Sequence, residues 1–411
     1  MISRRHSLAL LGAAGATMAA LGPRAALARA ATDKRFVFVI LRGALDGLAA
    51  VPPFGDPAYR SARGALAFAE PGRNDGALDL DGRFGLHPAL EKLHAMYQAR
   101  EMLVVHAVAT PYRARSHFDA QDLLENGTTR PRGAADGWLN RALGLLGGGR
   151  SGDQRLGLAV GQTVPLVLRG ATPVGAWAPQ QLPELNVDFM SRLAQLYAPD
   201  PVLGPAIREG MRAQAMNDSV LRGGEGGGRM AQGGNGPRGP RSVAAAAQAV
   251  GRLLGAAQGP RAAVIEIGGW DTHSGQGLLT GRLAPVLRML GDGLGALKTA
   301  LGPAWRETVI AVATEFGRTV APNGTNGTDH GTAGAAFLLG GAVAGGRVIG
   351  TWPGLAPNRL LEGRDLAPTT DLTGVLKAVL IGHLGLPLDA VDRVVFPGAA
   401  AVAPLPDLLR T

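Results

Sequence analysis

Five short segments of the 411-residue chain carry the kinds of side chain that bind metal ions and attack esters. Each holds a carboxylate, and several add a histidine or a hydroxyl. They are Asp46 with Gly47, RSHFDAQD at 115–122, GGWDTH at 268–273, TEFGRT at 314–319 and GTDHGTAG at 327–334. The chain has no cysteine, which excludes thiolate metal sites and a cysteine nucleophile. A metal would therefore be held by nitrogen and oxygen ligands, a set that suits a hard or borderline divalent ion.

Asp271 and His273 are candidate metal ligands because of their spacing. Side chains alternate along an extended segment, so two residues that are two positions apart lie on the same side of it. One Zn or Mn ion could accept both side chains. Such binding needs an ionised Asp271 and a neutral His273, so we expect it to weaken as the pH falls through the range in which histidine titrates.

Ser116 stands where a helix is predicted to begin. Its hydroxyl would lie beside free backbone N–H groups and the positive end of the helix dipole, which favours an alkoxide and an incoming anion. A metal near Asp46 could activate that hydroxyl. Ser116 and Asp119 also fit a capping box, which would explain Ser116 without a catalytic role. Asp46 could likewise belong to an ordinary turn. Arg318 has a planar fork suited to an anion, or it could form a structural ion pair with Glu315.

Apolar runs of strand or helix length alternate with these polar segments. Continuous apolar, β-branched runs are typical of strands buried on both faces. In the intervals between these runs, apolar residues recur at helical spacing, which indicates helices. We expect strands at 36–41, 102–108, 156–160, 166–168, 262–267, 308–313, 337–339 and 348–349, and helices at 87–100, 116–125, 138–146, 186–221, 243–257, 278–301 and 371–384. This alternation predicts an α/β fold with a mostly parallel central sheet and helices on both faces, whose carboxyl edge gathers the polar segments.

Residues 1–30 have the plan of an export signal. The sequence SRR at 3–5 precedes an apolar stretch, and ARA at 28–30 supplies a small-residue cleavage site. The arginine pair is similar to a twin-arginine signal, which predicts the twin-arginine translocase as a partner during export. We expect a periplasmic or secreted protein with no stable membrane anchor once the signal is removed. Removal of four arginines would lower the formal charge from +9 to +5.

The positive charge does not indicate a nucleic-acid partner. The 41 basic residues are scattered, without a block of five or six, and aromatic residues make up only 5% of the chain. Nucleic-acid binding needs a clustered basic surface or aromatic platforms on which bases stack. We therefore expect no nucleic acid among the partners.

Residues 31–411 are expected to form one domain with insertions. The stretch 222–241 reads RGGEGGGRMAQGGNGPRGPR, which offers one methionine and no other core-forming residue. Such composition is typical of a flexible surface loop. The Gly-rich stretch does not clearly divide two cores, so it is not expected to be a domain boundary.

In the five polar segments the chain resembles the domain-of-unknown-function 1501 family, exported bacterial proteins that usually carry twin-arginine signals. The segments span nearly the whole mature chain in the family's order. That family is in turn similar to a remote branch of the alkaline phosphatase and sulfatase superfamily. The resemblance implies an alkaline phosphatase-like fold, a hydroxyl nucleophile at Ser116 and one or two divalent ions, Zn, Mn, Ca or Mg. Its implied metal ligands are Asp46, Asp271, His273, Glu315 and His330.

The sequence departs from the superfamily at Glu315-Phe316, where an Asp-His pair is usual. One implied ligand is therefore missing, and His117 could fill the gap or simply bond to backbone. We expect a metal-dependent hydrolase of a small anionic phosphate or sulfate ester, with Ser116, His117 and Arg318 as catalytic residues. The alternative is a non-catalytic periplasmic binding or assembly protein that keeps the site for an anion or a metal.

Deletion of 222–241 should leave the melting temperature nearly unchanged, because the segment offers almost nothing to bury. Thermal unfolding of the full chain and the deletion variant measures this. A large drop would show that the Gly-rich segment is packed and that the single-domain interpretation is wrong.

Overall fold

The computed structural model describes residues 32–146, 155–161, 163–178, isolated positions between 196 and 211, and 240–410. Its main sheet is built from β1 (Arg35–Arg42), β4 (Met102–Ala109), β5 (Gly157–Val160), β6 (Val174–Trp177), β7 (Ala262–Gly268), β8 (Thr308–Thr314), β9 (Gly334–Leu339), β10 (Arg347–Ile349) and β11 (Thr370–Asp371). The strand order is β10-β4-β9-β8-β1-β7-β5-β6, and β11 pairs with β4. A small hairpin of β2 (Leu78–Asp79) and β3 (Gly85–Leu86) stands apart.

The main sheet is mostly parallel. Strand β9 runs antiparallel to its neighbours β4 and β8, and the other described pairs are parallel. Strands β1, β4, β7 and β8 therefore end at the same edge of the sheet. This arrangement confirms the predicted α/β fold and brings the loops after these strands together.

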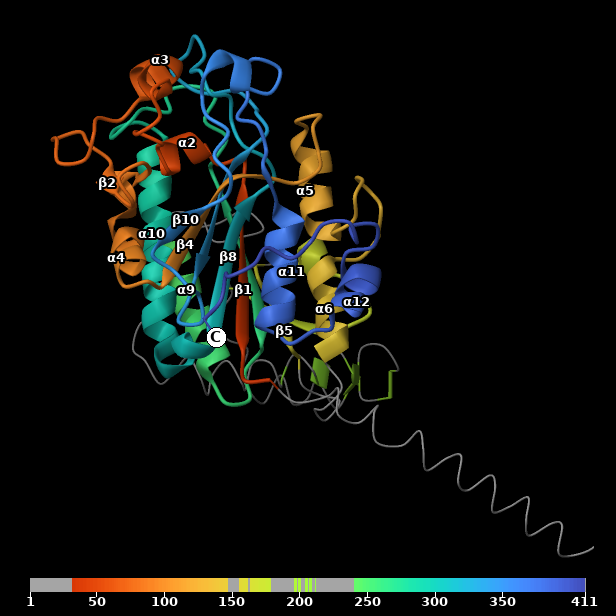
Figure 1. Cartoon of the computed structure of the whole chain (residues 1–411). Coiled ribbons are helices and arrows are strands. Elements are labelled where there is room, and N and C mark those ends of the chain that lie inside the picture. The colour runs from red at the N-terminus through yellow and green to blue at the C-terminus, as the bar shows by residue number, and fades with distance from the viewer. Residues whose placement is uncertain are drawn as a thin grey trace, which may run out of the picture.

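Helices cover both faces of the sheet (Figure 1). One face carries α4 (Glu91–Gln98), α9 (Pro240–Gly255) and α10 (Leu283–Leu301); the other carries α5 (His117–Asn126), α6 (Trp138–Leu146) and α11 (Leu372–Gly382). Short helices α2 (Gly47–Ala50) and α3 (Tyr59–Arg63) lie beyond the end of the sheet, and α12 (Leu388–Ala390) lies beside α6.

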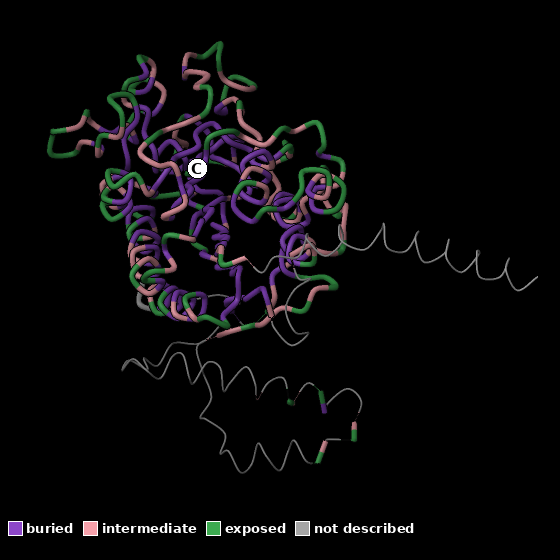
Figure 2. Tube along the Cα trace, turned by 60° about the horizontal axis from the view of Figure 1, so that its bottom comes forward, coloured by how far each residue is buried: buried purple, intermediate pink, exposed green. Residues whose placement is uncertain are grey.

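Strand β1 shows why the sheet is buried on both sides. Val37 and Val39 pack into the core beneath α4, α9 and α10, whereas Phe36 and Phe38 pack into the core beneath α6 and α11. The Trp138 ring meets the Phe38 ring edge-on, with centroids 5.3 Å apart. Figure 2 shows that the buried segments lie mostly in the interior, with half-buried and exposed segments around them. A strand with two apolar faces needs both helical layers, which is what the continuous apolar run predicts.

Two predicted elements were wrong. Leu166–Leu168 forms the short 3₁₀ helix η4 instead of a strand, because Pro165 precedes a run too short to define a strand. The helix predicted at 278–301 begins at Leu283, since Gly277 and Gly281 have φ angles of 70° and 117° that no α-helix accepts. Most of the predicted helix at 186–221 and nearly all of the Gly-rich stretch at 222–241 lie outside the described residues. In the described part of the chain, no helix is long and apolar enough to cross a membrane.

Three buried histidines hold backbone rather than ligands. The Nε2 atoms of His87, His106 and His383 each lie 2.9 Å from a backbone carbonyl oxygen. The Nδ1 atoms of His87 and His106 accept a backbone N–H, which requires the neutral ring. Because burial penalises the charged ring, it lowers the pKa of each of the three to about 4.

The free energy of unfolding should therefore fall as the pH drops from 6.5 towards 4. In the unfolded state each histidine binds a proton near pH 6.5, whereas in the folded state it does so only near pH 4. The stabilisation is therefore complete above pH 6.5 and is lost as the pH falls from 6.5 to about 4. Urea unfolding at pH 7 and pH 5 measures the loss, which should be about 2 kcal/mol smaller in His106→Gln than in the wild type. Equal losses in both proteins would contradict the assignment.

Candidate metal centre

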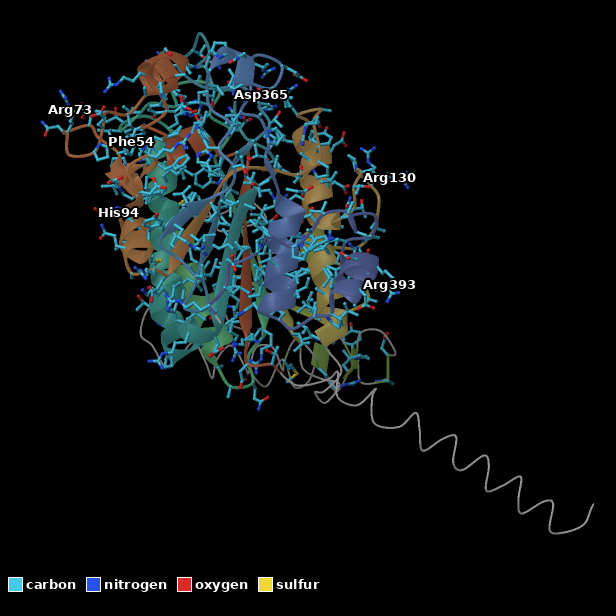
Figure 3. All side chains as sticks on the ribbon, viewed as in Figure 1. Phe54, Arg73, His94, Arg130, Asp365 and Arg393 are labelled. Carbon is cyan, nitrogen blue, oxygen red and sulfur yellow. The ribbon has the colours of Figure 1, made fainter. Side chains whose placement is uncertain are left out.

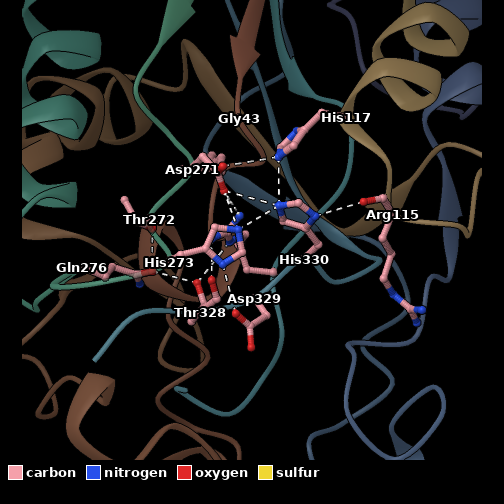
Figure 4. Close-up of polar contacts among 12 residues, drawn as sticks. Gly43, Arg115, His117, Asp271, Thr272, His273, Gln276, Thr328, Asp329 and His330 are labelled. Atoms are coloured by element: carbon pink, nitrogen blue, oxygen red, sulfur yellow. Dashed lines mark hydrogen bonds and ion pairs between the residues drawn. The ribbon is translucent and has the colours of Figure 1, made fainter. Parts of the chain in front are cut away.

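Three histidines and an aspartate meet at the carboxyl edge of the sheet (Figure 4). His117 begins α5, which follows β4, while Asp271 and His273 follow β7. His330 lies in the loop between β8 and β9, where its backbone forms an isolated antiparallel β-bridge with that of Arg318. Segments that are distant in the sequence converge here because their strands end at one edge. The positions of Asp271, His273 and His330 after successive predicted strands led us to expect that these three would meet, whereas the place of His117 was left open.

His330 is the middle member of the group. Its Nε2 atom lies 2.9 Å from His117 Nε2 and 3.0 Å from His273 Nε2. An Asp271 carboxylate oxygen lies 3.4 Å from His330 Nε2 and 3.0 Å from His273 Nε2, and the second Asp271 oxygen lies 3.7 Å from His117 Nε2. His117, Asp271 and His330 each offer a ligand atom within 4.8 Å of the others.

The opposite nitrogen of each ring faces an acceptor. Nδ1 of His117 lies 2.7 Å from Glu315 Oε1, and Nδ1 of His273 lies 3.0 Å from Asp329 Oδ1. Nδ1 of His330 lies 3.0 Å from the carbonyl oxygen of Arg115. A carbonyl or an ionised carboxylate only accepts, so each Nδ1 carries the hydrogen. In the neutral ring this leaves a bare lone pair on every Nε2.

Lone pairs at such short separations repel unless a cation lies among them. Protons on His117 and His273 would both point at His330 Nε2, which has a single lone pair and accepts one good hydrogen bond. A metal ion can draw on all these lone pairs and on the Asp271 carboxylate. Ligand atoms that share one ion at about 2.1 Å lie roughly 3.4 Å apart at tetrahedral angles and about 3.0 Å apart at octahedral angles, a range that the distances at His330 approach from below. The donor set therefore fits a divalent metal.

Arg318 holds Asp271 in place. Its guanidinium is fully buried; Nη1 donates to Asp271 at 2.6 Å, Nε donates to Thr328 Oγ1 at 3.2 Å and Nη2 donates to the Thr328 carbonyl. The pKa of Asp271 is raised by partial burial, but the bonds and charge of Arg318 outweigh this and hold it below its usual value. These contacts favour a positioning role for Arg318 over the predicted contact with a substrate anion.

Glu315 lies behind His117 rather than beside the other ligand atoms. Its Oε1 accepts hydrogen bonds from His117 Nδ1, Gln121 Nε2 and Gly43 N at 2.7, 3.0 and 2.9 Å, and its Oε2 accepts one from Thr314 Oγ1 at 2.9 Å. Burial raises the pKa of Glu315, yet these bonds lower it below its usual value. The hydrogen bond between Glu315 and His117 is also the main cause that raises the pKa of His117. Glu315 thus orients His117, and the structure favours His117 over Glu315 as a ligand.

Asp46 is occupied by a separate set of partners. Its Oδ1 caps α2 by accepting the N–H groups of Leu48 and Ala49 at 3.1 Å. Its Oδ2 accepts from Arg63 Nη2 at 2.6 Å and from Gln276 Nε2 at 2.7 Å. Asp46 and Arg63 have at most 1% exposed side chains. All four contacts are charge-assisted or capping bonds, so they favour a structural role for Asp46 over the predicted metal ligation.

A buried chain of hydrogen bonds connects Asp46 with the metal-binding group. Gln276 Oε1 accepts from Thr272 Oγ1 and from Thr328 Oγ1 at 2.8 Å, and Thr328 in turn accepts from Arg318. Gln276 and Thr328 are fully buried. The chain Asp46, Gln276, Thr328, Arg318, Asp271 therefore fixes the Asp271 carboxylate from behind.

Ser116 stands at the N-cap position of α5, immediately before His117. Its side chain makes no cap hydrogen bond, so the capping-box alternative lacks its defining contact. The hydroxyl has no hydrogen-bond partner among the residues that the structure describes. Ser116 is half-buried, which leaves the group available at the positive end of the helix.

Several functional contacts were not predicted from the sequence. Asp329 contacts the ring of His273, and Gln276, Thr328 and Arg63 complete the buried chain. Asp329 directly precedes His330 and could have been found from that pairing. The other three carry no distinguishing spacing, since their roles depend on which loops meet.

Residues 95–395 match the family described as "Protein of unknown function (DUF1501)". The chain belongs to this family. Among curated proteins, none matches it.

Three solved structures of low identity show partial likeness to this DUF1501 member. Ps i-CgsB in complex with k-i-k-neocarrahexaose is 9% identical, with a TM-score of 0.42, covering 90% of this chain and 76% of that one. The phosphonate monoester hydrolase of Agrobacterium radiobacter is 13% identical, with a TM-score of 0.34, covering 86% and 74%. BT1596, a 2-O GAG sulfatase, is 12% identical, with a TM-score of 0.32, covering 90% and 75%. Scores below 0.5 leave the function to be argued from this chain's own residues.

Replacing Asp46 by Asn should lower the free energy of unfolding by about 3 kcal/mol, because Arg63 would become an unpaired buried charge. Metal content should stay at the wild-type level. Chemical unfolding and elemental analysis measure the two effects. Asp119→Asn is the control, since Asp119 pairs at 3.6 Å with an Arg132 side chain that is 84% exposed, and such pairs contribute at most about 1 kcal/mol. Loss of metal in the folded Asp46→Asn protein would restore Asp46 as a ligand.

Proposed function

We propose that the chain is a periplasmic, metal-dependent hydrolase of a phosphate or sulfate ester. The observation that carries the proposal is the position of His330 Nε2, 2.9 and 3.0 Å from the Nε2 atoms of His117 and His273, beside the Asp271 carboxylate. A bound divalent ion would supply a positive charge that polarises an ester oxygen and lowers the pKa of an adjacent hydroxyl or water. His117, Asp271, His273 and His330 would hold it.

The chain's own residues would prepare the site in two ways. The carboxylates of Glu315 and Asp329 and the Arg115 carbonyl hold the three rings in one tautomer, which raises their basicity as ligands. Arg318 holds the Asp271 carboxylate through its buried guanidinium. Ligands fixed in this way need no reorganisation when charge develops, which is the source of electrostatic catalysis.

Ser116 is the proposed nucleophile. Its hydroxyl is directly adjacent in sequence to a ligand, has no cap bond and stands at the N-terminus of a ten-residue helix. The free N–H groups and dipole at that end favour both the negative charge of the attacking oxygen and the anionic group of the ester.

A second candidate function is metal or anion binding without catalysis. Arg318 is buried on Asp271, a contact that favours a positioning role over the predicted role towards a substrate anion. This observation favours a binding or assembly role. The same ligand group serves both functions, so measured turnover is needed to separate them.

The full chain lacking 1–30 should bind a divalent metal, and His330→Ala should lose most of it, because the central ligand is removed. Ser116→Ala should keep the metal and lose no more than about 1 kcal/mol of stability, while its turnover of an aryl phosphate or aryl sulfate should collapse. Elemental analysis and a release assay with Zn²⁺ and Mn²⁺ measure these properties.

His94→Ala is the matched control for His330→Ala, since His94 is a half-buried histidine on α4 that donates to the Asp79 carbonyl at 2.7 Å. It should keep both metal and turnover. Wild-type protein that is full of metal and hydrolyses neither ester would favour the binding function. Wild-type turnover in Ser116→Ala would make a water molecule the better nucleophile.

A further inference from the structure

His330 differs from the other two histidines in what holds its ring. Carboxylates orient His117 and His273, but a backbone carbonyl, that of Arg115, accepts the hydrogen on His330 Nδ1 at 3.0 Å. A carbonyl can serve in this way only if its own peptide is held still. The contacts that fix the backbone at Arg115 therefore also bear on the ring of His330.

The backbone at Arg115 has an unfavourable conformation. Its φ angle is +59°, a left-handed value that costs free energy in a residue with a side chain and persists only where surrounding contacts enforce it. The Arg115 side chain supplies such contacts. Its Nε and Nη2 atoms lie 2.9 and 2.7 Å from Asp365 Oδ2, and Nη2 lies 2.6 Å from Glu362 Oε2.

Asp365 is the rigid half of this anchor. Its side chain is fully buried, whereas that of Glu362 is 59% exposed. Asp365 Oδ2 also accepts from Thr332 Oγ1 at 2.8 Å, and Asp365 Oδ1 lies 3.0 Å from Arg364 Nε. Buried, multiply bonded carboxylates lose little further freedom on holding a partner, whereas exposed pairs contribute little.

The loop that bears Asp365 also holds the backbone of His330 itself. Arg364 Nη2 donates to the His330 carbonyl at 2.6 Å, and the Ala333 N–H donates to the Leu366 carbonyl at 3.3 Å. Figure 3 shows Asp365 among the loops beyond the end of the sheet, and Figure 4 shows Arg115 with its carbonyl directed at the His330 ring. One loop thus fixes both ends of the hydrogen bond between Arg115 and His330.

We propose that Asp365, acting through Arg115, is a positioning residue that sets the tautomer of His330. By holding the Arg115 carbonyl against Nδ1–H, it keeps the lone pair of His330 on Nε2, directed at His117 and His273. The proposal rests on the proposed metal function for its purpose, but the tautomer is a property of the metal-free protein.

Histidine-selective ¹⁵N NMR of the metal-free wild type measures the tautomer directly. His330 should show a hydrogen on Nδ1 and a bare Nε2. A folded wild type whose His330 carries its hydrogen on Nε2 overturns the proposal without reference to any variant. Wild-type protein that has the expected tautomer but binds no Zn²⁺ would instead overturn the proposed function alone.

The double variant Arg115→Gln, Asp365→Asn removes the anchor without leaving an unpaired buried charge. His330 should then populate the Nε2–H tautomer, and affinity for Zn²⁺ alone, measured by competition with a chromophoric chelator, should fall 10- to 100-fold. Glu362→Gln is the matched control, because it removes the exposed carboxylate from the same guanidinium. It should change affinity by less than about twofold.

A double variant that folds and keeps the wild-type tautomer and Zn²⁺ affinity would show that Asp365 is only a structural brace. If the double variant does not fold, Arg115→Lys replaces it, since lysine keeps the charge but lacks the planar fork. That variant should lose Zn²⁺ affinity several-fold and show a mixed tautomer. Wild-type values in Arg115→Lys would overturn the proposal.

Discussion

The contacts at the carboxyl edge of the sheet depend on three imidazole lone pairs that are directed at one another. Close approach of His117, His273 and His330 is unfavourable without a cation, so each ring must be held by its other nitrogen. Glu315 and Asp329 supply that hold from the loop between β8 and β9, and the Arg115 carbonyl supplies it from the loop between β4 and α5. The buried chain from Asp46 to Arg318 does the same for Asp271. The site is therefore prepared by the fold before any ligand binds.

This arrangement requires buried charged groups, and the packing of the sheet offsets the free energy that their desolvation costs. Asp46, Arg63, Glu315 and Arg318 are almost completely buried, and each finds several partners, which is the condition under which buried charges are tolerated. Apolar layers on both faces of the strands supply the hydrophobic burial that offsets the cost of desolvation. A less rigid scaffold would let the polar groups separate and hydrate, and the ligand atoms would then lose their alignment.

Sequence periodicity predicted the strands that carry the site, because an apolar run such as 36–41 has few alternatives to burial. The positions after these strands also predicted a meeting at one edge of the sheet, of Asp46, Ser116, Asp271, His273, Glu315 and His330. The sequence could not place His117. Sequence periodicity could not predict which carboxylates belong to the ligand group and which ones hold other side chains in place. Asp46 and Glu315 look like ligands in the sequence, and only the tertiary contacts with Arg63 and His117 show that they act on neighbouring side chains.

The departure at Glu315-Phe316 has a physical explanation in these contacts. Glu315 is not in the group of ligand atoms but bonds to His117, whose ring offers a nitrogen to that group. Phe316 is buried, and its ring packs 4.9 Å from the ring of His117 and 5.1 Å from that of His330. An apolar ring this close packs against both imidazoles and restricts their movement. The pair thus supports two histidines from behind, one by a hydrogen bond and both by packing, which is a different way of building a site with nitrogen and oxygen ligands.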